Sequence, residues 1–205
     1  MRKQLEIILQ KLVPHSKPSA ELEQYMTPGD IAAALLHLAH AHKDIGNKTV
    51  CDLGCGTGRL AIGAALVGAK RVIGVDVDPV ALEIAAENAR LAGVDVKFVK
   101  GDVTKFKACG IDVVIQNPPF GVQRRGADMV FLRKALKLAP VVYSLHKATP
   151  DNRAFISARV KGLGAKITDR IELEFHIPKQ FSFHTRKVYR FKVDLYRIEK
   201  GGKKW

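Results

Sequence analysis

The stretch TVCDLGCGTG at residues 49–58 decides the fold. Its first half is short and apolar and begins with β-branched residues, which is typical of a buried strand. Its second half carries Gly54, Gly56 and Gly58, and a glycine-rich turn between a strand and a helix lets a ligand approach the backbone closely. The stretch therefore predicts a strand, a ligand-binding turn and a helix that continues to about Val67.

Strands and helices alternate along the rest of the chain. Residues 2–12 and 28–41 have helical spacing, and Thr27 is the expected N-cap with Pro28 at the first helical position. We expect further strands at 71–76, 96–99, 111–115 and 141–145, helices at 79–91, 126–138 and 150–161, and two final strands at about 164–176 and 186–198. The alternation predicts an α/β fold, a doubly wound, Rossmann-like sheet of seven strands that is mostly parallel and ends in an antiparallel hairpin. We expect a single domain over residues 1–205, with 1–45 as an N-terminal helical extension that forms part of the site.

A second informative stretch, NPPFG at residues 117–121, follows the apolar run 111–115. Neither Pro118 nor Pro119 has an N–H to give to a sheet, so the strand ends at Asn117. The Asn117 carboxamide oxygen and the Pro118 carbonyl can both accept hydrogen bonds from one –NH2 group, and the Phe120 ring can stack on a flat base. This combination suits an exocyclic amine on a planar ring, such as adenine N6. An ordinary strand-ending turn is the alternative.

Three acidic residues follow strand ends and indicate what the glycine turn binds. Asp76 ends the second strand, where an acid can hold both ribose hydroxyls. The turn reads Gly-x-Gly-x-Gly rather than the dinucleotide pattern Gly-x-Gly-x-x-Gly. Asp52 lies just before it and suits a cofactor with a cationic amino-acid tail, and Asp102 is placed to accept from an adenine amino group. Helix capping and solvation of strand ends are the alternative roles for these acids.

Charge is distributed unevenly along the 205 residues, whose formal net charge is +14. Residues 1–120 hold 14 basic and 13 acidic residues, whereas residues 121–205 hold 20 basic and 7 acidic ones. The asymmetry predicts a polyanionic partner, a nucleic acid, bound mainly by the C-terminal part. A generally basic protein with solvated charges is the alternative.

The cysteine and histidine content predicts neither a disulfide framework nor a metal site. The cysteines are Cys51, Cys55 and Cys109, and so small and odd a number indicates a reducing compartment, with a cytoplasmic location expected. The histidines at 37, 40 and 42 lie in an Ala/Leu-rich helical segment without zinc spacing. Polar residues interrupt the apolar N-terminus, so no signal peptide is expected, and no segment is long and apolar enough to span a membrane.

Together these motifs resemble those of class I S-adenosylmethionine-dependent methyltransferases that act on exocyclic amines. More narrowly, nearly the whole chain resembles the methyltransferase-like protein 5 family, whose members methylate adenine N6 in small-subunit ribosomal RNA. The matching stretches are LEQY at 22–25, DLGCG at 52–56, NPPFG at 117–121, VYSLHK at 142–147 and FH at 183–184. The resemblance implies S-adenosylmethionine contacts at Gln24, Thr27, Asp52, Gly54, Gly56, Thr57, Arg59, Asp76, Asp102, Val103 and Asn117. It implies catalytic roles for Asn117, Pro118 and Phe120, with the Arg59 contact made by its backbone.

Two partners are expected. The loop between the last two strands alternates aromatic and basic residues, which suits unpaired RNA; its candidate RNA contacts are Lys179, Phe181, Phe183, His184, Arg186 and Lys187. Packing of Phe181 and Phe183 in the core is the alternative, and the basic helix with Arg133, Lys134 and Lys137 would then be the better candidate. The resemblance also implies a small zinc-containing activator protein that adds to the sheet at its third-strand edge, residues 96–99.

Three other functions remain open. Glutamine N5-methylation of a protein uses a similar Asn-Pro-Pro with Tyr in place of Phe, so Phe120 and the basic C-terminal half disfavour it. DNA adenine methylation would need a base-reading domain that the sequence does not indicate. A non-enzymatic RNA-binding protein would not need the intact cofactor and Asn-Pro-Pro-Phe motifs.

Overall fold

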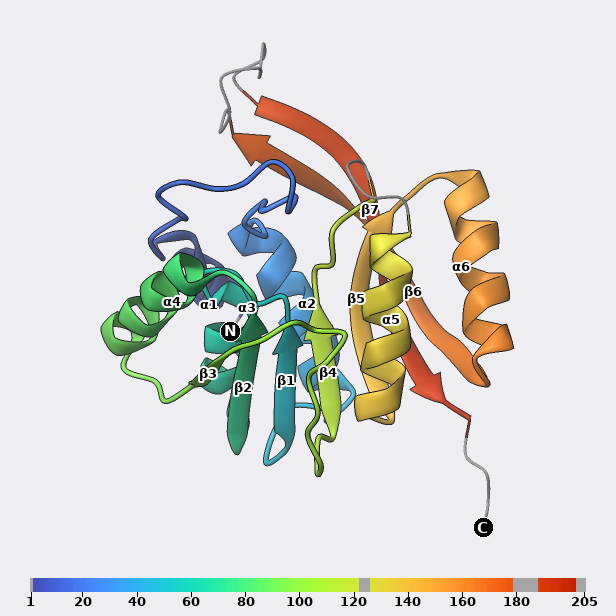
Figure 1. Ribbon diagram of the computed structural model, residues 1–205, viewed down its shortest axis with the longest axis horizontal. Helices are drawn as coiled ribbons and strands as arrows, with labels where there is room; N and C mark the ends of the chain where they lie inside the picture. Colours follow the sequence, from blue (N-terminus) through green and yellow to red (C-terminus); the bar gives the residue numbers. More distant parts are fainter. Residues whose placement is uncertain (1, 122–125, 179–187, 202–205) are drawn as a thin grey trace.

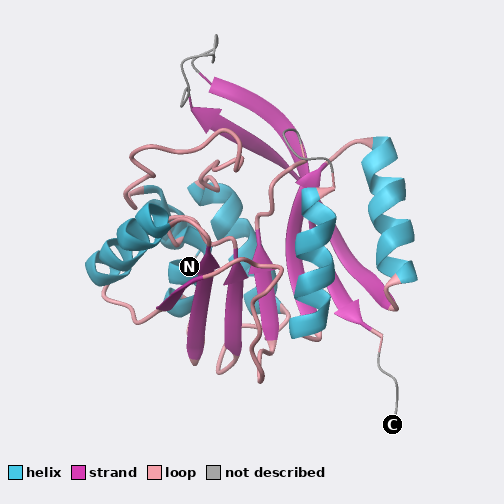
Figure 2. Cartoon of the chain, viewed as in Figure 1, coloured by secondary structure: helices cyan, strands magenta, loops and turns pink. Residues whose placement is uncertain are grey.

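A computed structural model describes residues 2–121, 126–178 and 188–201 of the chain. Figure 1 shows the order of the elements, and Figure 2 separates helices from strands. The described elements are α1 (Arg2–Gln10), α2 (Gly29–Ala41), β1 (Thr49–Leu53), α3 (Arg59–Leu66), β2 (Arg71–Asp76), α4 (Pro79–Ala92), β3 (Lys97–Lys100), β4 (Val113–Gln116), α5 (Ala127–Leu138), β5 (Val141–Lys147), α6 (Pro150–Gly162), β6 (Ala165–Pro178) and β7 (Val188–Lys200).

The strands form one seven-stranded sheet in the order β3-β2-β1-β4-β5-β7-β6. The first five strands in this order are parallel to one another, and β7 pairs antiparallel with both β5 and β6. The predicted fold class is therefore confirmed. The strand order reverses between β1 and β4, and ligands bind at the carboxyl ends of strands beside such a switch point.

Helices cover both faces of the sheet because its strands are apolar on both sides. Neighbouring residues of β1 point in opposite directions: Val50 belongs to the core beneath α1, α2, α3 and α4, and Cys51 to the core beneath α5 and α6. Val113 and Val114 of β4 divide in the same way. In Figure 1, α5 and α6 lie in front of the sheet and α2 and α3 behind it.

Local sequence explains where α4 and α6 begin. Asp78 caps α4 by accepting from the backbone N–H groups of Val80 and Ala81, and Pro79 follows at the first helical position. Thr149 caps α6 by accepting from the N–H of Asn152, and a proline follows again.

The start of α2 differs from the expectation. The predicted Thr27 cap is wrong, because Pro28 occupies the N-cap position and its side chain has no atom that can accept a hydrogen bond. The Thr27 hydroxyl is bonded elsewhere, since it accepts a hydrogen bond from Asn117. A residue with the local pattern of a helix cap thus serves a contact between distant segments.

Cys51 and Cys55 are buried thiols, as small packed residues should be, and Cys109 is exposed. No group of His, Cys, Asp and Glu suited to a metal ion occurs within residues 2–121, 126–178 and 188–201. Over the same residues, no helix combines the length and apolar character that crossing a bilayer requires.

Candidate active site

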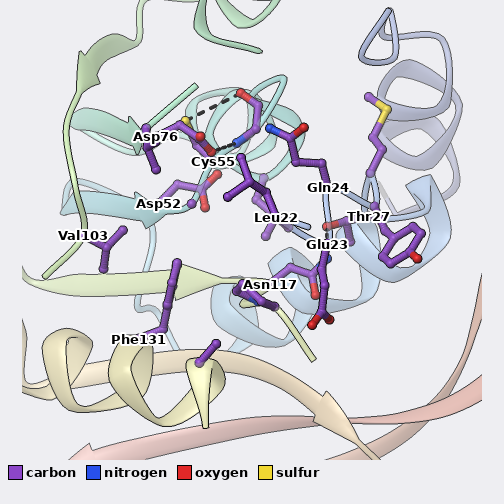
Figure 3. Close-up of a pocket in the computed structure, with 18 of the residues that line it drawn as sticks. Leu22, Glu23, Gln24, Thr27, Asp52, Cys55, Asp76, Val103, Asn117 and Phe131 are labelled. Atoms are coloured by element: carbon purple, nitrogen blue, oxygen red, sulfur yellow. Dashed lines mark hydrogen bonds between the residues drawn. The ribbon is translucent and has the colours of Figure 1, made fainter. Parts of the chain in front are cut away.

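A cavity of about 680 Å³ lies at the carboxyl ends of β1, β2 and β4. Figure 3 shows side chains from three sources around it: the strand ends, the segment that precedes α2, and α5. The glycine turn after β1 forms one wall and residues 21–27 form the opposite one. Ten of the lining residues are labelled in Figure 3: Leu22, Glu23, Gln24, Thr27, Asp52, Cys55, Asp76, Val103, Asn117 and Phe131.

The glycine turn has a conformation that other residues would strain. Gly54 has φ of +70° and Gly56 has φ of +51°, both in the left-handed region. A Cβ on Gly54 would come within 2.8 Å of the Phe131 ring of α5, whereas one on Gly56 would meet no atom within 4 Å. The Asp76 carboxylate holds the turn in place, since its Oδ2 accepts from the Gly56 N–H at 2.7 Å. The backbone at Gly56 therefore has free space beside it, whereas the backbone at Gly54 packs against α5.

Asp52 lies near the end of β1, two residues before Gly54. Its Oδ2 accepts from the backbone N–H of Ala61 at 3.0 Å. Within the part of the chain that the structure describes, no group donates to its buried Oδ1. Burial raises the pKa of Asp52 to about 8, the Ala61 hydrogen bond opposes the rise, and the nearby Asp76 charge adds to it. Such a carboxyl suits a cationic ligand group, which would restore the ionised form.

The other two predicted acids differ in exposure. Asp76 is buried and accepts from the N–H groups of Gly56 and Asp78, and burial nevertheless raises its pKa above the ordinary value. Asp102 is exposed at the cavity rim, where hydrogen bonds from the Thr104 hydroxyl and N–H lower its pKa. Both remain able to accept from a ligand, because a carboxylate offers about four lone-pair sites.

The segment before α2 is tied over the cavity through Asp78. The Gln24 Nε2 donates to Asp78 Oδ2 at 2.7 Å, and the His15 Nε2 lies 2.8 Å from the same oxygen. Burial acts to raise the pKa of Asp78, but these two side chains and two backbone N–H groups outweigh it and lower the pKa. The Ser19 N–H donates to the Gln24 carboxamide oxygen and completes the connection. Gln24 therefore lines the cavity and also holds the segment before α2 in place over it. We call this segment, residues 11–28, the cover.

Asn117 lines the cavity, and its side chain is held by Thr27. Its Nδ2 donates to the Thr27 hydroxyl at 3.0 Å, while no group among the described residues donates to its buried Oδ1. Thr27 is held in turn by Arg59, whose Nη1 donates to the Thr27 carbonyl at 2.6 Å. Arg59 is buried, which lowers its pKa to about 10. The Arg59 side chain thus reaches Thr27, which leaves its backbone for the predicted ligand contact.

Comparison with known proteins places this site in a family. The family model for ribosomal protein L11 methyltransferase (PrmA) matches residues 33–118. The rRNA N6-adenosine-methyltransferase METTL5 of Danio rerio is 37% identical over 96% of this chain and 97% of its own. Its namesake in Drosophila melanogaster is also 37% identical, over 97% and 96%. The chain belongs to the METTL5 family.

The solved structure of a provisionally assigned RNA methyltransferase from Pyrococcus horikoshii agrees with that assignment. It is 45% identical, covers 98% of both chains and has a TM-score of 0.93. The predicted family and enzyme class, a methyltransferase, are thereby confirmed. The METTL5-family relatives match the chain end to end, whereas the L11 methyltransferase model stops at Pro118. Sequence similarity to the METTL5 family therefore extends over the C-terminal half, which the L11 methyltransferase model does not match.

The aromatic residue of the Asn-Pro-Pro-Phe motif lies beside the cavity rather than in its wall. The Phe120 ring is half-buried and packs edge-to-face on Phe175 and Phe191, with centroids 5.5 and 5.4 Å away. These partners belong to β6 and β7, so the C-terminal hairpin of this METTL5-family chain reaches the motif. Pro118 is buried. Stacking of Phe120 on a base stays a prediction, since its ring already has protein partners on the hairpin side.

Thr57 and Val103 line the cavity as predicted for cofactor contacts, and both are buried. The buried Thr57 hydroxyl has no hydrogen-bond partner among the residues the structure describes, so it remains for a ligand.

The predicted RNA-binding loop is a different case. Its six candidate contacts, Lys179, Phe181, Phe183, His184, Arg186 and Lys187, lie outside the described residues. The end of β6 and the start of β7, which flank them, pair with each other (Pro178 with Val188). In Figure 1 this part of the hairpin lies beyond the carboxyl ends of the parallel strands. The hairpin therefore extends on the side of the sheet where the cofactor cavity lies.

The sequence analysis missed several residues that line the cavity or hold its walls in place. His15 and Phe131 line the cavity, although neither belongs to a recognisable motif. Asp78 had a local signal, since an Asp before a proline is typical of a helix N-cap, but that signal says nothing about Gln24, 54 residues away. Asn88 lacked any signal: its Nδ2 donates to the carbonyls of Val13 and Thr57, joining the cover to the glycine turn.

Proposed function

We propose that this METTL5-family chain transfers a methyl group from S-adenosylmethionine to the exocyclic N6 of an adenine in ribosomal RNA. The observation that carries the proposal is the Asn117 carboxamide: Thr27 engages its nitrogen, and its buried oxygen has no donor among the described residues. Asn117 lines the same cavity as the three acidic residues Asp52, Asp76 and Asp102. The relatives from Danio rerio and Drosophila melanogaster are named rRNA N6-adenosine-methyltransferases, which supports the same substrate.

The residues around the cavity fit S-adenosylmethionine. A volume of about 680 Å³ lies within the range of small-molecule sites. Asp52 offers its buried Oδ1 to the cationic amino group, Asp76 offers acceptors to the ribose hydroxyls, and Asp102 offers one to the adenine amino group. Thr57, Val103 and the backbone of Arg59 line the remaining surface. When bound, the cofactor supplies a methyl group activated by a sulfonium centre.

The protein acts on the target amine. The lone pair of adenine N6 is delocalised into the ring, which makes the amine a weak nucleophile. The Asn117 oxygen and the Pro118 carbonyl accept from the two N6–H groups and favour a tetrahedral nitrogen with a localised lone pair. Alignment and the fixed dipoles of the site lower the barrier further. The target base must be unpaired or flipped out of its stack to reach these acceptors.

The alternative of glutamine N5-methylation is not favoured. Relatives named as an N5-glutamine methyltransferase and a release factor glutamine methyltransferase match only 38% and 42% of this chain. The C-terminal half of the chain is basic. In that half the described helices α5 and α6 each carry three basic residues and one acidic residue. A protein substrate needs no such charge, whereas the phosphate backbone of RNA does.

Finer features of the proposal concern the target, the location and the domain. The substrate is the RNA of the small ribosomal subunit, modified in the cytoplasm. The chain acts as one domain over residues 1–205. Its N-terminal extension, 1–45, completes the site, which is supported by the cover that Gln24 and His15 tie to Asp78.

A small zinc-binding activator protein is the proposed partner. It would add a strand at β3, which is the edge strand of the sheet (Figure 1). Lys97 and Lys100 of this strand are exposed. Binding of such a partner should slow amide hydrogen exchange at residues 97–100. A chain that is fully active alone, and shows no such protection when mixed with the activator, would contradict this part.

The deciding experiment is methyl transfer from isotopically labelled S-adenosylmethionine to purified ribosomal RNA, followed by digestion and mass spectrometry of the nucleosides. Labelled N6-methyladenosine in small-subunit RNA is the expected product. The matched control is the Asn117→Ala variant, which should bind the cofactor and leave the RNA unlabelled. Label in a ribosomal protein, or in a nucleoside other than N6-methyladenosine, would overturn the proposal.

A further inference from the structure

A second cavity, of about 420 Å³, lies between α5 and α6. Figure 1 shows these two helices side by side in front of the sheet. One side of the cavity is formed by Gly126, Met129 and Arg133 and the other by residues 155–163. Gly126 also lines the cofactor cavity. We call the second cavity the α5–α6 groove; it shares Gly126 with the cofactor cavity as a lining residue.

The groove contains two arginines, Arg133 and Arg159, and both are exposed. Among the described residues, neither forms an ion pair, whereas the neighbouring Arg153 of α6 is paired with Asp194 and Glu172. Arg133 donates from its Nε to the Met129 carbonyl, which leaves its charge uncompensated. The charge of the two groove arginines is therefore available to a ligand, while that of Arg153 serves the fold.

An exposed aromatic ring accompanies these cations. The Phe155 side chain is 42% exposed, although it is large and apolar. The apolar residues Ile156 and Val160 of the same helix are buried. The Arg159 guanidinium lies 5.0 Å from the centre of the Phe155 ring. Base stacking on an exposed ring and phosphate contacts from guanidinium groups are how proteins bind unpaired nucleic acid.

We propose that the α5–α6 groove binds the single-stranded RNA that adjoins the target adenine. This inference rests on the proposed function, because it assigns the path of that substrate next to the site. Because Gly126 lines both cavities, one strand inserts its target base at Asn117 and continues along α5 and α6. Arg133 and Arg159 contact phosphates and Phe155 stacks on a base. The positive charge of the groove favours a polyanion over a neutral ligand.

The test compares a groove variant with a variant of equal charge change. Arg133→Ala/Arg159→Ala is the groove variant, and Lys70→Ala/Arg71→Ala removes two exposed cations near the amino end of β2, away from both cavities. Binding of a short unstructured RNA is measured by fluorescence anisotropy at several salt concentrations. The groove variant should bind about tenfold more weakly, and its salt slope should fall by about 1.4, since each phosphate contact to a single strand contributes about 0.7. The control should keep the affinity and slope of the unmodified chain.

A third variant separates stacking from charge. Phe155→Leu keeps the apolar bulk and should weaken RNA binding by about tenfold with an unchanged salt slope, because a lost stacking partner removes no phosphate contact. Cofactor affinity, measured by calorimetry, should not change in any of these variants. Equal RNA affinity and slope for the unmodified chain and the groove variant would overturn the inference and leave the groove to a protein partner. The proposed function fails separately, if the unmodified chain transfers no methyl group to ribosomal RNA.

Discussion

Gly126 lines both the cofactor cavity and the α5–α6 groove, but the ionisable groups of the cavity are mainly acidic and those of the groove are basic. The cavity contains the buried carboxylates of Asp52 and Asp76, and the groove contains the exposed guanidinium groups of Arg133 and Arg159. Each charge matches the ligand proposed for it: a cationic amino-acid tail and ribose hydroxyls in the cavity, and phosphates in the groove. The proposed binding sites for the cofactor and for the RNA backbone are thus adjacent, and Gly126 lines both.

Burial makes the two regions respond to different conditions. Charges inside the cavity are poorly screened by salt, but burial shifts their pKa values, so binding there should depend on pH. Charges along the groove are solvated, so binding there should depend on salt. Substitutions in one region should therefore leave the behaviour of the other unchanged.

The largest effect is expected for Asn117→Ala. Loss of the acceptor for N6–H should lower turnover on the order of 100- to 1,000-fold, by analogy with removal of one preorganised hydrogen-bonding group at a reacting centre. Affinity for S-adenosylmethionine and for RNA should stay within a small factor of the original values. Single-turnover methylation and calorimetry measure the two quantities. Turnover close to that of the unmodified chain would remove Asn117 from the chemistry.

Asp76→Ala should affect cofactor binding instead. The ribose would lose a charged acceptor, so the cofactor dissociation constant should rise by roughly 30-fold, as expected for a hydrogen bond to a charged group. Asp95→Ala, at an exposed site before β3, is the matched control for the change in charge. Because Asp76 also holds Gly56, thermal unfolding should accompany the measurement. A variant that is stable and binds the cofactor normally would contradict the ribose assignment.

Cofactor binding should take a proton from Asp52. Burial raises the pKa of this carboxyl to about 8, so it is mostly neutral at about pH 6, and a cationic partner would favour its ionised form. Binding at about pH 6 should therefore release close to one proton, and affinity should rise by up to about tenfold between about pH 6 and about pH 7. Calorimetry in buffers of different ionisation enthalpy measures the release, and Asp52→Asn should abolish it. Heats that do not depend on the buffer would contradict the contact.

The raised pKa of Asp52 also has a consequence for stability without ligand. The folded state favours the neutral carboxyl, whereas the unfolded chain ionises near about pH 4. The contribution of Asp52 to the free energy of unfolding should therefore decrease as pH rises from about 4 towards about 8, and stay constant above that. Denaturant unfolding of the unmodified chain and Asp52→Asn across this range measures the difference. A difference between the two chains that does not vary with pH would show that the pKa of this carboxyl is the same in the folded and unfolded states.

The smallest effect is expected at Thr27. Its hydroxyl accepts from Asn117 and so keeps the carboxamide oxygen directed away from itself. Thr27→Val has the same shape without that acceptor and should lower turnover about fivefold at saturating cofactor, the effect of one neutral hydrogen bond. Thr27→Ser should restore most of the turnover. Equal losses in both variants would point to packing of the threonine methyl group rather than to orientation of Asn117.

Strand-end residues were predictable because their positions follow from short-range patterns. An apolar run followed by glycine, an acid or Asn-Pro marks where a strand ends, and parallel strands end at the same edge of a sheet. The amino-acid sequence alone therefore brings Asp52, Asp76 and Asn117 together. The boundaries of the elements followed in the same way, since β4 begins two residues later than expected but still ends just before Asn117.

The long-range neighbours were decided only by tertiary structure. Thr27 has the pattern of a helix cap, yet it bonds to a residue 90 positions away, and Gln24 bonds to Asp78 across 54 positions. Phe120 has the pattern of a stacking platform, yet its ring packs on two phenylalanines of the C-terminal hairpin. Local patterns determine backbone conformation and the direction of a side chain along its own element. Which distant residue a side chain contacts depends on how the cover, the sheet and the C-terminal hairpin pack together. A sequence pattern in one of these segments carries no information on the segment that packs against it.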